Sequence, residues 1–76
     1  MKFEEIYNPK MKQIDDTIHF NNFMVKQEGI DNFVVYEKNP LQVPFYKIAD
    51  ATSKLAATKK AKLLQIGYNI AREDMN

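Results

Sequence analysis

The strongest pattern in this chain is one apolar stripe that continues at helical spacing through the C-terminal half. Placed on a wheel of about 100° per residue, the members of the stripe fall within about 120° of one another. They are Phe45, Ile48, Ala49, Thr52, Leu55, Ala56, Leu63, Ile66, Gly67 and Ile70. Because such a stripe is typical of a helix that buries one face, we expect an amphipathic helix over residues 44–72 that covers the core.

The stripe has one weak point, at residues 50–53, whose Asp, Thr and Ser side chains are poor in helix interiors and good as N-caps. Two arrangements follow. Either one helix, kinked at this point, runs through the whole of 44–72, or a short helix or strand over 44–49 ends before the main helix begins. We favour the continuous helix, which Pro44 would open at the first helical position, where its missing N–H costs nothing.

Two residues interrupt the apolar character of the stripe. Lys59 lies inside it, and two interpretations remain open. Either its stem covers apolar surface while the ammonium reaches water, or its charge forms a buried or interfacial ion pair that sets the register of an oligomer. Gly67 costs roughly 1 kcal/mol relative to alanine in a helix interior, and we expect it to mark a close helix crossing.

The middle of the chain has the composition of β-strands. Residues 32–37 are rich in β-branched and aromatic side chains, and residues 17–26 alternate between polar and apolar. The alternation changes phase at two central asparagines, as it does where a β-bulge inserts one residue. We place the chain reversal at 27–31, with Gly29 as its residue of positive φ. These patterns predict a β-hairpin over 17–38, or a three-stranded antiparallel sheet, packed against the helix.

Residues 1–16 carry no single pattern. Five large apolar residues share one helical face, but the proline at position 9 interrupts it, since the residue before a proline avoids the helical region. A short strand or turn followed by one helical turn fits equally well. Asp15 and Asp16 are expected to form a turn before the first strand of the hairpin. The chain as a whole, residues 1–76, is expected to form a single small α+β domain.

The short length limits what this chain can bury. A domain of 76 residues buries only about 60% of the surface that its unfolded chain exposes. The chain has no cysteine, so neither a disulfide nor a thiolate metal site reinforces it. Domains of this size often gain the missing burial by pairing, and we expect this one to associate with itself.

Catalytic chemistry has few candidate residues. The one histidine, His19, is expected to be an exposed strand residue, and the one serine, Ser53, has no base at a defined spacing. Adjacent carboxylates such as Asp15 and Asp16 point apart on a strand or a helix. The two glycines are too far apart for a phosphate-binding loop. We therefore expect no enzyme activity, no cofactor and no metal site.

The net charge of +1 conceals an uneven distribution. Residues 1–43 carry −2 and residues 44–76 carry +3. A cationic helix can lie along phosphates, and amide side chains on it can contact bases, so an alternative function is that of a DNA-associated regulatory protein. Its candidate nucleic-acid contacts are Lys54, Lys60, Lys62, Gln65, Asn69 and Arg72. The simpler interpretation is a lysine face that only keeps the protein soluble.

The preferred function is that of a small non-enzymatic protein-binding module. Tyr46 and Tyr68 lie about 100° or more from the stripe, and tyrosines exposed beside a helix favour a second contact surface. Together with Lys59 they form the candidate protein interface.

The origin and location of the protein follow only from composition. The abundance of Asn, Lys and Ile indicates an AT-rich bacterial or phage genome, and a phage- or mobile-element-encoded modulator or inhibitor of a host protein fits this size. The acidic N-terminal residues and the lack of a run of about 20 apolar residues predict a cytoplasmic protein with no membrane segment.

Overall fold

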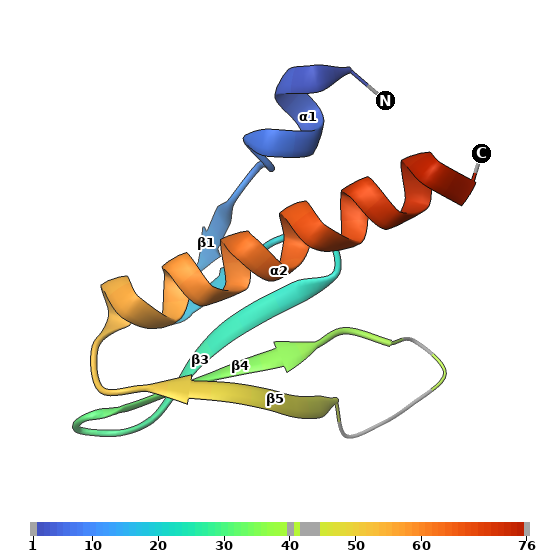
Figure 1. The fold of residues 1–76 in the computed structure, drawn as a ribbon. Coiled ribbons are helices and arrows are strands. Elements are labelled where there is room, and N and C mark those ends of the chain that lie inside the picture. Colours follow the sequence, from blue (N-terminus) through green and yellow to red (C-terminus); the bar gives the residue numbers. More distant parts are fainter. Residues whose placement is uncertain (1, 40, 42–44, 76) are drawn as a thin grey trace.

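Five antiparallel strands form one sheet, and a long C-terminal helix crosses one face of it (Figure 1). The computed structural model describes residues 2–39, 41 and 45–75. The strands are adjacent in chain order, and they are β1 (Lys12–Ile14), β2 (Thr17–His19), β3 (Phe23–Gly29), β4 (Asn32–Glu37) and β5 (Tyr46–Ala51). The helices are α1 (Phe3–Tyr7) and α2 (Lys54–Met75). The α+β class is confirmed, but the expected two or three strands are too few.

The residues expected to open the helix form β5 instead, so the favoured continuous helix over 44–72 is wrong, and the structure agrees with the alternative of a short strand before the main helix. β5 pairs antiparallel with β4, with Val34 opposite Asp50 and Val35 opposite Ala49. This pairing gives the backbone N–H and C=O groups of β4 partners on both sides. It also completes the burial of both valines. A helix over the same residues would leave β4 as an exposed edge.

The weak point at residues 50–53 is the start of the helix and not a kink. The Ser53 side-chain oxygen accepts a hydrogen bond from the Ala56 amide at 3.1 Å, as an N-cap does. α2 begins at the next residue and continues for 22 residues. Pro44, expected at the first helical position, lies outside the described residues. Within the described part of the chain, no helix is long and apolar enough to cross a membrane.

The chain reversal expected within 27–31 is confirmed, since the turn between β3 and β4 lies at residues 30–31, but two details of the expected hairpin are wrong. The asparagines at 21–22 do not form a bulge but connect β2 to β3, where the Phe20 amide donates to the Phe23 carbonyl at 2.8 Å. Gly29 ends β3 without a positive φ. β3 and β4 pair irregularly between Gln27 and Gly29, so the bulge of this hairpin lies near its tip and not at the asparagines.

The first sixteen residues form a helical turn and then a short strand, whereas the expected order was a strand or turn followed by a helical turn. α1 ends before the proline at position 9, in agreement with the helix-breaking effect of that residue. The turn expected at Asp15 and Asp16 is confirmed, and it joins β1 to β2. Asp15 adopts a φ of 53°, a conformation that aspartate tolerates better than most residues.

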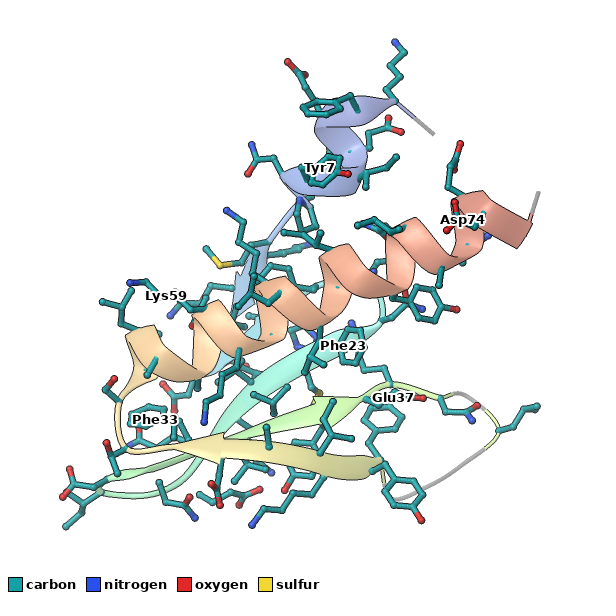
Figure 2. All side chains as sticks on the ribbon, viewed as in Figure 1. Tyr7, Phe23, Phe33, Glu37, Lys59 and Asp74 are labelled. Carbon is teal, nitrogen blue, oxygen red and sulfur yellow. The ribbon has the colours of Figure 1, made fainter. Side chains whose placement is uncertain are left out.

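The core lies between the sheet and α2, and nearly all of its volume comes from the sheet side. Its large buried side chains are Ile18, Phe20, Phe23, Val25 and Val35, with Phe33 packed at the margin. α2 contributes Ala57 and Ala61, both at 0% exposure. Figure 2 shows Phe23 and Phe33 on the sheet side of α2. Because alanine is small, the helix backbone can lie close to these larger side chains.

The part of the apolar stripe that lies on α2 does not face this core, which corrects the expectation that the helix covers the core with the stripe, whereas Ala49 of β5 does pack against the core. The first members of the stripe belong to β5 and its flanking residues, so they do not share the phase of the helix. The helical members Leu55, Leu63 and Ile70 are exposed. The side of α2 that faces the sheet carries the two alanines, and further along the helix the buried polar residues Gln65 and Asn69 face the β2–β3 connection and α1.

Candidate protein interface

The side of α2 that faces away from the sheet carries most of its large aliphatic side chains. These residues recur at spacings of three and four, which places them on one side of a helix. We call this set the outer stripe, and it consists of Leu55, Lys59, Leu63, Ile66, Gly67, Ile70 and Asp74. Leu55 and Leu63 are 66% and 68% exposed, and Ile66 is half-buried. Figure 2 shows Lys59 and Asp74 toward opposite ends of the helix.

α1 lies beside the C-terminal half of α2 (Figure 1). The Asn69 side-chain amide fixes it there by donating to the backbone carbonyls of Glu5, at 3.2 Å, and Ile6, at 3.3 Å. The rings of Phe3 and Tyr7 contact each other, with centroids 4.6 Å apart, and both are exposed. α1 therefore adds aromatic surface on one flank of α2.

Gly67 makes no close packing contact with other elements in the described part of the chain. A Cβ atom added at this position would meet nothing within 4 Å. A glycine in a helix interior is nevertheless unfavourable by roughly 1 kcal/mol relative to alanine. The close crossing expected at Gly67 is therefore not made with another part of the described chain.

The structure does not gather the three expected interface residues on one surface. Lys59 lies on the outer stripe, whereas Tyr46 is exposed on β5 at the edge of the sheet. Tyr68 packs edge-on against Phe23, with ring centroids 6.3 Å apart, and the Arg72 guanidinium lies 6.0 Å from the Tyr68 ring. Tyr68 thus covers one end of the core, although part of its ring remains exposed.

The sequence analysis missed Leu63 and Ile70 as surface residues because it assigned the whole stripe to the core. A weaker signal for the true orientation was present. Ala57 and Ala61 lie four residues apart on the other side of the helix, where they can pack against a sheet. Alanine is only weakly hydrophobic, so the larger aliphatic residues on the other side of α2 determined which side was expected to face the core.

The six residues expected to contact nucleic acid do not form one face. Gln65 and Asn69 are buried and bonded to each other, with Gln65 Nε2 donating to Asn69 Oδ1 at 3.0 Å. Lys60 Nζ donates to the Asp50 carbonyl at 2.7 Å, on the flank nearest β5. The remaining three, Lys54, Lys62 and Arg72, are exposed. The two carboxamides that would contact bases are thus part of the interior.

A second surface feature is a polar hollow of about 830 Å³ between α1, the first strands and the C-terminal half of α2. Lys12, His19 and Lys38 line it, together with Glu4 and Glu5. His19 is half-buried there and not exposed as expected, with Nδ1 3.4 Å from Lys38 Nζ. Burial, with the charges of Lys38 and Lys12, lowers the pKa of the imidazole, and burial lowers the pKa of Lys38.

The lowered pKa of His19 favours the neutral imidazole, which lies beside the Lys38 ammonium. A neutral imidazole nitrogen can accept a hydrogen bond from the Lys38 ammonium. Within the described residues, no group of three or more His, Asp or Glu side chains could hold a metal ion. Ser53 lies at the start of α2 and does not line the hollow, so the described residues place no serine nucleophile beside the histidine.

The substitution Lys38→Met is expected to raise the pKa of His19, because it removes a positive charge that disfavours protonation of the imidazole. The measurement is an NMR titration of the His19 ring resonances. Lys54→Met is the control, since it removes an exposed lysine at the start of α2. An unchanged His19 pKa in Lys38→Met would show that the two side chains do not interact.

Comparison with known proteins does not place the chain in a family. No protein-family model matches it, and no curated protein or solved structure is significantly similar to it.

Proposed function

We propose that this chain is a non-enzymatic protein-binding module that binds through the outer stripe of α2 and associates with copies of itself. The observation that carries the proposal is the orientation of α2. The helix turns its alanines toward the sheet and two bonded carboxamides toward α1 and the β2–β3 connection, and it turns Leu55, Leu63 and Ile70 toward solvent.

Exposure of these side chains leaves a large stabilisation unused in a single copy. Burying a leucine or isoleucine side chain fully is worth about 1.5–3 kcal/mol relative to leaving it in water. The outer stripe presents several such side chains in a row, along a helix of 22 residues. A row of this kind matches the way an amphipathic helix binds a partner helix or groove.

The small core supports the same proposal. Among the described residues, α2 supplies only two alanines to the buried apolar core. A second copy that covers the outer stripe would give α2 an apolar contact on each side. The alternative contact with nucleic acid gains no support from Gln65 and Asn69, because both are buried.

The substitution Leu63→Lys is expected to weaken self-association by roughly a hundredfold or more, because it removes a central apolar contact from both copies and places a charge there. Light scattering after size exclusion, over a concentration series, measures this directly. We expect wild type to approach about twice the 8.9 kDa chain mass and Leu63→Lys to remain at the chain mass.

The matched control is Ile30→Lys, which places the same charge at an apolar residue that is 90% exposed in the β3–β4 turn. This control is expected to associate as wild type does. A wild-type chain that stays monomeric at every concentration, or a Leu63→Lys variant that associates normally, would contradict the proposal.

A further inference from the structure

We propose that two copies of α2 pair in antiparallel orientation about a twofold axis that passes between Ile66 and Gly67. This inference rests on the proposed function, because it names the partner of the outer stripe as a second copy of the chain and gives the register of the pairing. The outer stripe is self-complementary about this point in shape and in charge.

The pairing follows from the spacing of the outer stripe. In an antiparallel pair of helices, each residue faces the residue that lies equally far on the other side of the twofold axis. Leu63 of one copy then faces Ile70 of the other, because each lies three to four residues from the axis. Lys59 of one copy faces Asp74 of the other, seven to eight residues from the axis. Each pair occurs twice.

Gly67 explains the position of the axis. At the centre of the pair, Ile66 of one copy lies against Gly67 of the other. The space that a Cβ of Gly67 would occupy is open, because no atom outside its chain neighbours and the adjacent helix backbone lies within 4 Å among the described residues. A residue without a side chain lets two helix backbones approach more closely than the usual 8–10 Å. The glycine thus has a packing role in the pair that it lacks in a single copy.

The charges decide the orientation. In a parallel pair, Lys59 would face Lys59 and Asp74 would face Asp74, and both contacts would be repulsive. In the antiparallel pair, each lysine faces an aspartate at the margin of the apolar contact. Charges in such flanking positions set orientation and partner choice in paired helices. The lysine inside the stripe, unexplained by the core of one copy, is explained by this contact.

Charge reversal tests the register. Lys59→Glu alone and Asp74→Lys alone are each expected to weaken self-association roughly tenfold, because each turns two attractive contacts into repulsive ones. The double variant restores opposite charges and is expected to regain wild-type association. An equal mixture of the two single variants is expected to form mixed dimers, in which both contacts are attractive.

Disulfide formation gives an independent measurement. The chain has no cysteine, so a single introduced cysteine is its only thiol. In a mixture of Leu63→Cys and Ile70→Cys chains, oxidation is expected to join mainly unlike chains, because positions 63 and 70 face each other across the axis. A parallel pair would instead join like chains, 63 to 63 and 70 to 70.

The outcomes separate this inference from the proposed function. If Leu63→Lys prevents association but the single charge reversals have no effect and like chains become joined, the register is overturned while the outer stripe remains the interface. If Leu63→Lys leaves association intact, both proposals fail. Weakening by each single reversal, recovery in the double variant and disulfides between unlike chains together support the antiparallel pair.

Discussion

Replacing Gln65 by leucine is expected to lower the free energy of unfolding by about 3 kcal/mol, although leucine fills a similar volume. Gln65 is 1% exposed. Its Oε1 accepts a hydrogen bond from the Asn22 amide at 2.7 Å, and its Nε2 donates to Asn22 Oδ1 at 2.9 Å and to Asn69 Oδ1 at 3.0 Å. Leucine removes all of these bonds and leaves their partners in place.

The expected loss is large because the bonds of Gln65 join separate parts of the chain. Asn22 lies in the connection between β2 and β3, and Asn69 holds the carbonyls of Glu5 and Ile6 in α1. Among the described residues, no buried side-chain polar atom lacks a partner. Breaking one member of a fully bonded buried network leaves several polar groups without partners, which costs more than one hydrogen bond.

Urea denaturation measures this effect, with both proteins at the same concentration because association with a second copy would also stabilise the folded chain. Gln13→Leu is the control, since Gln13 is exposed on β1 and bonds only the nearby Asp15 carbonyl. The control is expected to change stability by less than about 0.5 kcal/mol. Equal stability of Gln65→Leu and wild type would show that the network does not stabilise the fold.

The strand over residues 32–37 and the helix from Lys54 could be predicted because their signals are local. β-branched residues in succession favour a strand whatever surrounds them, and the serine at position 53 is a helix-start signal in itself. β5 could not be predicted in this way. Its residues fit a helical phase equally well, and what makes them a strand is the free edge of β4, which the local pattern of residues 46–51 does not reveal.

The orientation of α2 was predicted wrongly for a related reason. Sequence periodicity locates an apolar side of a helix, but it does not say whether that side meets the core of the same chain or another molecule. The side that faces the core is specified by Gln65 and Asn69, whose partners lie 43 and more than 60 residues away in the sequence. A single sequence does not show that these carboxamides have buried partners.

Replacing Ala61 by leucine is expected to lower the free energy of unfolding by about 3 kcal/mol, toward the upper end of the cost of overpacking a core. Ala61 is fully buried against the sheet, in the same cluster as Phe23, Val25 and Val35. The extra carbons would push α2 away from these side chains and open gaps along the rest of the contact.

The matched control is Ala71→Leu, which makes the same change on the same helix at an exposed alanine. If the alanine side of α2 faces the sheet, thermal or urea unfolding will separate the two variants clearly, with Ala71→Leu close to wild type. If the apolar stripe faced the sheet instead, Ala61→Leu would lie on the solvent side and would cost almost nothing. The comparison therefore tests the orientation of α2, on which the outer stripe and its pairing both depend.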